Sequence, residues 1–264
     1  MKSLAVVLGA VGLVAAHGYV DNATIGGNYY QASPPSTSKH CLIITNDLDN
    51  IPYSDPYMNP APQRVERPIP GNGPVQDVTL IDIQCNGWSA GGTVGSKPAP
   101  LHAPAAAGSA VTLHWTLWPD SHVGPVITYM ARCPDSGCQS WQPGTSAVWF
   151  KIKEGGRDGT SNNWATTPFM RPGSSYVYNI PSCLKSGYYL VRHEIIALHA
   201  SSQYPGAQFY PGCHQLQVTG GGSTVPSSNL VAFPGAYKGS DPGITYDAYK
   251  PQTYIIPGPK VFSC

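Results

Sequence analysis

The chain carries little charge. Only 11% of its residues are Asp, Glu, Lys or Arg, and the formal net charge is +1; an average soluble protein has about 25% charged residues. Lys2 is one of the 15 basic residues, so 14 remain beside the 14 acidic residues once the N-terminal segment is removed. No basic patch is available to follow a phosphate backbone, which excludes nucleic acid as a partner. Such a surface suits a neutral polymer.

Common hydrolytic motifs are also missing. The chain has three glutamates, Glu66, Glu154 and Glu194, and no two acids fall at the ends of neighbouring predicted strands as a carboxylate pair around a glycosidic bond requires. There is no Gly-x-Ser-x-Gly elbow, no His-Glu-x-x-His and no phosphate-binding loop. The sequence therefore disfavours the usual hydrolase chemistries.

No apolar run approaches the ~20 residues of a membrane span. The apolar stretch at 4–14 follows Lys2 and ends in small residues, which predicts a signal peptide over residues 1–16. Cleavage there makes His17 the first residue of a secreted, extracellular protein that needs no membrane partner. Asn22 begins a glycosylation sequon, Asn22-Ala23-Thr24.

Seven cysteines in a secreted chain indicate disulfides. Cys133 and Cys138 are close enough in sequence to close a local turn, and Cys85 and Cys213, which we place at strand ends, can bridge distant strands. The odd number leaves one thiol free. The bonding of the other three cysteines stays open: Cys41, Cys183 and Cys264.

Strand signals dominate the mature chain. β-Branched and aromatic residues recur with partial alternation, bounded by Gly, Pro or Asn, over residues 78–86, 111–118, 126–133, 148–154, 175–180, 187–199 and 208–219. No window shows a helical apolar stripe. The pattern predicts an all-β antiparallel sandwich in one domain, 17–264, with long surface loops at 29–75 and 220–264. We expect the second loop to form a C-terminal arm, with no separate carbohydrate-binding module.

His17 and His122 are the first candidate site. A mature N-terminal histidine offers its α-amine and its ring, and these nitrogens can chelate one metal ion. His122 lies in a turn between two predicted strands, WPDSHVGPV, where its ring can meet the chain terminus. Three nitrogens in a T-shaped arrangement favour Cu(II).

Gln208 and Tyr210 are the second candidate site. They lie two residues apart on a predicted strand and so share a face. Tyr210 can serve as a distant axial oxygen, with Gln208 as a hydrogen-bond partner for bound oxygen. His199 is close to this pair in sequence and is our choice for a further hydrogen-bonding residue, whereas His193, six residues away on the same strand, is structural.

These features together resemble the fungal lytic polysaccharide monooxygenases of auxiliary activity family nine, once classed as glycoside hydrolase family 61. The resemblance spans the mature chain. It rests on the following segments in order: HGYV, WPDSHVGPV, ARCPDSGCQSW, FKIKE, IPSCLKSGYYLVRHEIIALH, GAQFYPGC, FPGAYKGSDPGITYDAY and IPGPKVF.

The resemblance implies an immunoglobulin- or fibronectin type III-like sandwich that holds one copper ion. It implies that His17 binds through its amine and ring, His122 binds through its ring, and Tyr210 is axial. It also implies hydrogen bonds from His199 and Gln208 to oxygen species, and the disulfides Cys85–Cys213 and Cys133–Cys138.

The implied activity is oxidation of β-1,4-glucan chains of cellulose at C1, C4 or both. The co-substrate is O2 or H2O2, and electrons come from an external donor such as cellobiose dehydrogenase or small phenols. We expect a monomer that works on a flat polymer surface. Aromatic rings that stack on glucose are expected at Tyr246, Tyr249, Tyr254 and Tyr29, with Tyr30 as a further candidate in the early loop.

Two alternatives stay open at this point. One is a weak endoglucanase with Asp120 or Glu194 as its acid. The other is a non-catalytic protein that binds or loosens cell-wall polysaccharide.

Overall fold

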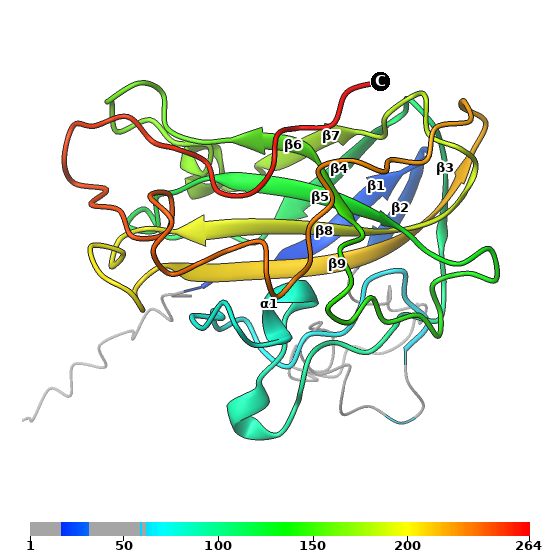
Figure 1. Ribbon diagram of the computed structural model, residues 1–264, viewed down its shortest axis with the longest axis horizontal. Helices are drawn as coiled ribbons and strands as arrows, with labels where there is room; N and C mark the ends of the chain where they lie inside the picture. The colour runs from blue at the N-terminus through cyan, green and yellow to red at the C-terminus, as the bar shows by residue number, and fades with distance from the viewer. Residues whose placement is uncertain (1–16, 32–58, 60–61) are drawn as a thin grey trace, which may run out of the picture.

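Two β-sheets pack face to face (Figure 1). The computed structural model describes residues 17–31, 59 and 62–264. In this part of the chain, the first sheet has the order β2 (Asn28–Gln31), β1 (Val20–Ile25), β4 (Ala110–Trp115), β7 (Ser175–Asn179). The second has the order β3 (Ala103–Ala106), β9 (Gln208–Thr219), β8 (Gly187–Ala197), β5 (Val126–Arg132), β6 (Trp149–Gly155). The predicted sandwich is confirmed.

The two sheets differ in how their faces are buried. In β4 exposed or half-buried residues alternate with buried ones, because one face meets the other sheet and the other meets solvent. In β8 every residue from Tyr189 to Ala197 is buried. The second sheet is covered on its outer side by the C-terminal arm, residues 220–264, which contributes Phe233, Tyr237 and Ile244 to the core. This arm runs over the sheet without forming a strand of its own (Figure 1).

Most predicted strands are present. The runs at 126–133, 148–154, 175–180 and 208–219 match β5, β6, β7 and β9 within one residue at each end, and those at 111–118 and 187–199 match β4 and β8 at their starts. Both of the latter end early, at Trp115 and Ala197, where the chain turns into the loops that carry His122 and His199.

The strand predicted at 78–86 is wrong. This segment forms turns and a short helix, α1 (Asp82–Cys85). The Asp82 carboxylate accepts hydrogen bonds from the Ser89 amide, the Ser89 hydroxyl and the Gly95 amide, each at 2.8 Å. Local bonds of this kind compete with strand pairing, and they fold the segment back on itself despite its β-branched residues.

Three short strands had no clear sequence signal. β1 and β2 are largely polar, and they form a hairpin at the sheet edge through Gly26 and Gly27, both with positive φ. β3 is Ala103-Pro104-Ala105-Ala106 and pairs in parallel with β9. Pro104 cannot donate to a ladder, and proline is tolerated on an edge strand such as this one.

Three disulfides are present among the described residues: Cys85–Cys213, Cys133–Cys138 and Cys183–Cys264. The first joins the end of α1 to the interior of β9, so the expectation that both cysteines lie at strand ends is wrong. The third ties residue 264 to the turn before β8. Cys41, His40 and the predicted signal segment 1–16 lie outside the described residues.

No helix among the residues described has the length and apolar character needed to cross a membrane.

Candidate metal centre

His17 and His122 meet at one end of the sandwich. β1 starts where β4 ends, since Val20 pairs with Trp115. His17 immediately precedes β1, and His122 lies in the turn after β4. The ring centroids of His17 and His122 are 5.8 Å apart with an interplanar angle of 74°. The two segments, about 100 residues apart in sequence, are therefore brought together by strand register.

Contacts around Gly18 fix the chain beside His17. A Cβ atom at Gly18 would lie 2.9 Å from the Trp118 ring, so only glycine allows this approach. The Tyr19 amide donates to Thr116 Oγ1 at 3.1 Å, and the Thr116 amide donates to the Tyr19 carbonyl at 3.0 Å. The chain just after His17 is thereby attached to the segment that leads to His122.

The turn that carries His122 is similarly held. The His122 amide donates to the Pro119 carbonyl, and Trp118 Nε1 donates to the His122 carbonyl at 2.7 Å. His122 Nδ1 lies 3.0 Å from Ser121 Oγ, which leaves Nε2 for a metal. A bond of this kind at the second ring nitrogen sets the orientation of a ligating histidine.

The histidines are held in their neutral form. Burial, with added repulsion from His199 and His17, lowers the pKa of His122 to about 4. Burial also lowers the pKa of His17. A neutral imidazole has a lone pair for a metal, whereas a protonated one does not.

Tyr210 lies against the same pair. Its ring centroid is 5.7 Å from that of His17 and 4.9 Å from that of Trp118, whose ring is nearly perpendicular to it. Burial raises the pKa of Tyr210, so it remains a neutral phenol. Its hydroxyl donates to Gln208 Oε1 at 2.7 Å, and the predicted neighbours Gln208 and Tyr210 are therefore in direct contact.

His199 completes the group. Its ring centroid is 3.9 Å from that of His122, and its Nδ1 is buried with no hydrogen-bond partner. A buried nitrogen without a partner is costly in a protein that has nothing bound. It is suited to a small ligand at this site. His193 lies apart from this group, where it accepts from Trp115 Nε1 at 3.0 Å.

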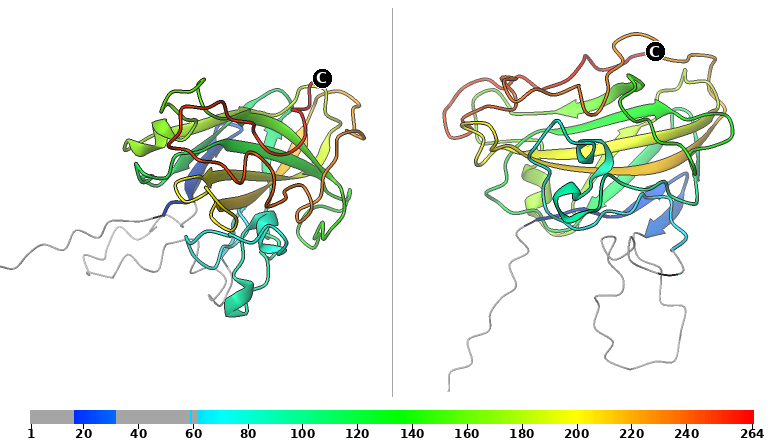
Figure 2. Two further views of the ribbon diagram at one scale, coloured as in Figure 1. Left: turned by 60° about the vertical axis from the view of Figure 1, so that its left-hand side comes forward. Right: turned by 60° about the horizontal axis from the view of Figure 1, so that its bottom comes forward.

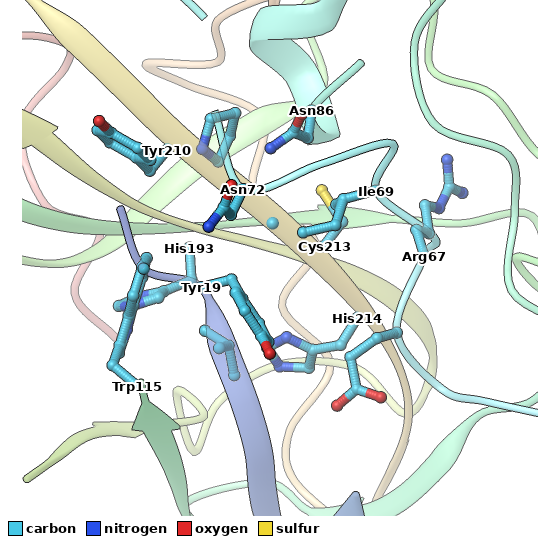
Figure 3. A pocket seen from close by; sticks show the side chains of 15 residues that line it. Tyr19, Arg67, Ile69, Asn72, Asn86, Trp115, His193, Tyr210, Cys213 and His214 are labelled. Atoms are coloured by element: carbon cyan, nitrogen blue, oxygen red, sulfur yellow. The ribbon is translucent and has the colours of Figure 1, made fainter. Parts of the chain in front are cut away.

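A small cavity lies next to Tyr210, between the start of β1 and β9 (Figure 3). Its volume is ≈ 50 Å³, and Tyr210, Trp115, His193 and His214 are among its lining residues. The cavity has room for water but not for a sugar polymer.

The donor set suits copper. His17 and His122 would supply two neutral imidazoles, and cleavage before His17 would add its α-amine as a third nitrogen. Nitrogen ligands of this kind, with the Tyr210 phenol close by, are ones that copper prefers over harder ions.

The four predicted stacking tyrosines have different positions. Tyr249 is 74% exposed and lies in the C-terminal arm at the same end of the sandwich as the histidines. Tyr29 is 61% exposed but pairs with Thr24, seven residues beyond His17 and thus ~20 Å away along the strand. Among these four, Tyr249 is placed best for a substrate at the metal.

Tyr246 and Tyr254 pack against other side chains. Tyr246 is only 7% exposed, and its ring packs on Trp164 and Tyr254. The Tyr254 hydroxyl donates to the Gly243 carbonyl at 2.6 Å, its ring also packs on Trp164, and the side chain is half-buried. Stacking of these two rings on a sugar stays a prediction.

Asn22 lies on β1, half-buried, with its Oδ1 enclosed; its glycosylation stays a prediction.

Three residues near the centre had no role assigned from the sequence: Trp118, Ser121 and Thr166. Thr166 Oγ1 accepts from the Gly124 amide at 3.0 Å and so attaches the His122 turn to the loop after β6. Trp118 and Ser121 are part of the WPDSH segment, but only the structure shows that they hydrogen-bond to the His122 carbonyl and ring.

One of the two acids proposed for a hydrolase, Glu194, is not accessible, whereas Asp120 is exposed. Glu194 is fully buried and forms an ion pair with Arg192. A carboxylate held in this way cannot reach a glycosidic oxygen. The endoglucanase alternative with Glu194 as the acid is therefore wrong.

Comparison with known proteins agrees with this geometry. The profile of Auxiliary Activity family 9 (formerly GH61) matches residues 17–254. The chain belongs to this family. Its members are lytic polysaccharide monooxygenases, which are oxidoreductases, so the resemblance seen in the motifs is confirmed, and the family implies a copper cofactor.

Similar proteins of the family align over the whole chain. An AA9 family lytic polysaccharide monooxygenase F from Podospora anserina is 62% identical over 100% of both chains. One from Botryotinia fuckeliana, also named F, is 55% identical over 100% of this chain and 99% of its own. Among solved structures, the extended catalytic domain of H. jecorina LPMO9A is 33% identical, with a TM-score of 0.76 over 94% of this chain and 91% of its own.

A cellulose-active polysaccharide monooxygenase from M. thermophila is 32% identical, with a TM-score of 0.71 over 94% of this chain and 99% of its own.

Proposed function

We propose that the protein, processed to begin at His17, is a secreted copper-dependent monooxygenase that cleaves cellulose chains by oxidation at C1, C4 or both. Its co-substrate is O2 or H2O2, and its electrons come from an external donor such as cellobiose dehydrogenase or a small phenol. It acts as a monomeric domain over 17–264. The convergence of His17, His122 and Tyr210 at one end of the sandwich is the observation that carries this proposal.

His17 and His122 would hold the metal. When bound, copper supplies the one-electron chemistry that activates the oxygen co-substrate for removal of a hydrogen atom from the sugar. The hydroxylated carbon then loses its glycosidic bond. Ser121 and the Trp118–His122 contact hold the His122 ring in the orientation that presents Nε2.

His199 and Gln208 would handle the oxygen co-substrate. Because Tyr210 donates to Gln208 Oε1, the amide NH2 of Gln208 is left to donate to another acceptor. The unpartnered Nδ1 of His199 supplies a second polar group on the same side. Together these groups can orient a small oxygen species, and His199 can pass a proton to it.

The substrate would lie across the end of the sandwich. A crystalline chain cannot be drawn into a deep cleft without first being lifted from its neighbours, whereas a metal at an open edge can work on the intact surface. Tyr249 offers an exposed ring that can stack on a glucose face. A cellulose-active relative is among the similar structures, which supports this choice of substrate.

Mass spectrometry of the soluble products tests the proposal. The copper-loaded protein is incubated with cellulose and ascorbate, beside a sample without reductant and the His17→Ala variant. Aldonic acids or 4-ketosugars that vanish in both controls support the proposal, and their type reports C1 or C4 attack. Native sugars alone would indicate a hydrolase, and binding without any product would indicate a polysaccharide-binding protein.

A further inference from the structure

We propose that Arg157 is the positioning residue that holds the glucan-stacking loop, residues 246–252, in register with the metal centre. This inference rests on the proposed function and adds to it a residue that touches neither metal nor sugar. The sequence motifs singled out Tyr246 and Tyr249 of this loop but not Arg157.

One guanidinium group binds this loop at three points. The two N–H groups of Arg157 Nη1 are shared among three acceptors: the Tyr246 hydroxyl at 2.8 Å, the Lys250 carbonyl at 2.6 Å and the Gln252 carbonyl at 3.2 Å. These acceptors lie on both sides of Tyr249 in the sequence. The loop is therefore wrapped around Arg157, while the Tyr249 side chain within it is 74% exposed to solvent.

Arg157 is itself held in place. Its Nε donates to the Ser161 carbonyl at 2.6 Å, and its Cζ lies 5.1 Å from the centre of the Trp164 ring. Lysine cannot reproduce these contacts, because it has no planar group that both stacks on an aromatic ring and donates hydrogen bonds in its own plane. The side chain is half-buried, so these contacts are partly shielded from water.

The loop that carries Arg157 is also attached to the metal centre. It follows β6, whose last residue Gly155 pairs with Val126 at the start of β5, four residues after His122. Thr166 near the end of the loop accepts from the Gly124 amide at 3.0 Å. Arg157 and His122 therefore share one rigid support.

A second attachment comes from the segment that carries His199. The Tyr246 amide donates to the Ser201 carbonyl at 2.7 Å, and the Ser201 hydroxyl donates to the Tyr246 carbonyl at 2.6 Å. This fixes the start of the stacking loop to the segment that carries His199, whereas Lys250 and Gln252 on its far side bind Arg157. Figures 1 and 2 show these loops gathered at the end of the sheets where β8 and β6 finish.

Within the loop, short-range bonds keep it compact. The Tyr249 amide donates to Asp247 Oδ1 at 3.1 Å, and the Tyr246 hydroxyl donates to the Gln252 carbonyl at 2.7 Å. Such a loop can move as a unit. Arg157 would therefore set where the Tyr249 ring stands relative to the metal, which decides how well a flat glucan surface contacts both at once.

A double-mutant cycle on cellulose adsorption tests this inference. Arg157→Gln is expected to lower the association constant about fivefold, the share of one aromatic contact, and Tyr249→Ala is expected to lower it by a similar factor. Adding Arg157→Gln to Tyr249→Ala should cause no further loss, because its effect acts through Tyr249. The charge-matched control is Lys185→Gln, at the opposite end of the sandwich, and it should adsorb like the unmodified protein.

Two further readouts separate positioning from misfolding. Arg157→Gln should raise the apparent KM for cellulose and leave both copper affinity and the oxidation of a small phenol unchanged. Arg157→Lys should recover adsorption only in part, since it keeps the charge but loses both the Nε–H bond to Ser161 and the contact of the guanidinium plane with Trp164. Loss of copper binding in Arg157→Gln would mean a general structural role and would overturn the inference.

Other outcomes are equally decisive. Independent, multiplicative losses in the cycle, unchanged adsorption in Arg157→Gln, or no adsorption by the unmodified protein would each overturn the inference. Failure of the proposed function shows separately, as an absence of oxidised sugars from the unmodified copper-loaded protein, whatever the adsorption cycle gives.

Discussion

At the scale of single residues, burial and ring contacts prepare the metal centre before any ion binds. His122 is kept neutral by its surroundings, with its pKa lowered to about 4, and His199 packs directly on its ring. The side chains at the centre therefore divide between groups that can ligate and groups that surround the ligands.

Replacing His199 should separate these two roles. We expect His199→Ala to reduce the rate of oxidised-sugar formation about 10- to 100-fold, the usual effect of removing a residue next to a metal ligand, while one equivalent of copper stays bound. Product analysis and metal analysis on the same preparation measure both quantities. His114→Ala, on β4 away from the centre, is the control and should keep full activity; complete loss of copper in His199→Ala would make His199 a ligand instead.

At the scale of elements, β9 shows how one strand serves both site and core. Gln208 and Tyr210 stand at its beginning, beside the metal centre, and Cys213 and His214 follow in its buried part. The pKa of His214 is lowered by burial to about 3, and its Nε2 lies 2.6 Å from the Tyr178 hydroxyl. Its neutral ring accepts that hydrogen bond and joins the two sheets.

This predicts a loss of stability in acid. Above pH 6.5 His214 is neutral in both states and contributes no pH dependence. Between pH 6.5 and about 3 only the unfolded chain binds the proton, so the free energy of unfolding falls as the pH is lowered, by about 1.4 kcal/mol per pH unit. Urea unfolding of the copper-free protein at a series of pH values measures this, and in His214→Gln the free energy of unfolding should fall less steeply as the pH is lowered. The same dependence on pH in the variant and the unmodified protein would contradict this assignment.

The elements also show what the sequence could and could not predict. Runs rich in β-branched and aromatic residues correctly predicted strands β5 to β9, because such side chains pack favourably on the surface of a sheet. The run at 78–86 had the same composition but formed α1, since Asp82 binds amides 7 and 13 residues ahead. Tyr246 and Tyr249 looked alike in sequence. Only the path of the arm, with Tyr246 turned onto Trp164, separates a packed ring from an exposed one.

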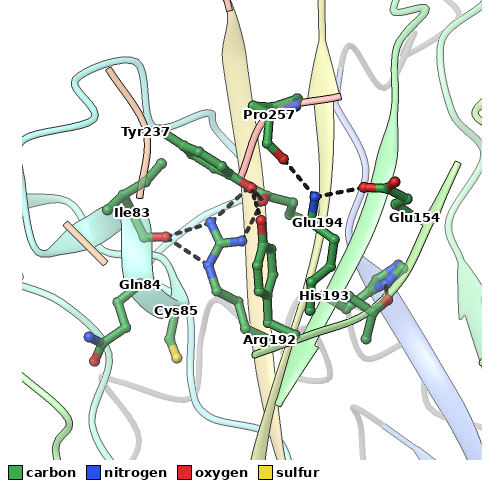
Figure 4. A network of polar contacts seen from close by, with 12 residues as sticks. Ile83, Gln84, Cys85, Glu154, Arg192, His193, Glu194, Tyr237 and Pro257 are labelled. Carbon is green, nitrogen blue, oxygen red and sulfur yellow. Dashed lines mark hydrogen bonds and ion pairs between the residues drawn. The ribbon is translucent and has the colours of Figure 1, made fainter. Parts of the chain in front are cut away.

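At the scale of the whole molecule, buried polar contacts fasten the C-terminal arm to the second sheet (Figure 4). The Arg192 guanidinium binds the Glu194 carboxylate and the Ile83 carbonyl, and the Tyr237 hydroxyl of the arm donates to Glu194. Further along, Lys151 Nζ donates to Glu154 at 2.6 Å and to the Pro257 carbonyl at 2.8 Å. Arm, α1 and sheet thus meet around two buried cations.

Breaking one of these pairs should be costly. Glu194→Gln leaves the Arg192 charge buried without its partner, and we expect it to reduce the free energy of unfolding by about 3–5 kcal/mol. The control is Asp135→Asn in the exposed pair Arg132–Asp135, whose aspartate side chain is 85% exposed; its cost should be below about 1 kcal/mol. Chemical denaturation compares the two, and equal losses would refute the importance assigned to burial.

The proposed metal centre needs a free amine at His17. Copper titration of two purified forms tests this need, one that begins at His17 and one that retains a single alanine before it. We expect tight binding of one copper ion by the first form and a large loss of affinity in the second, where the amine has become a peptide nitrogen. Equal affinity in the two forms would contradict it.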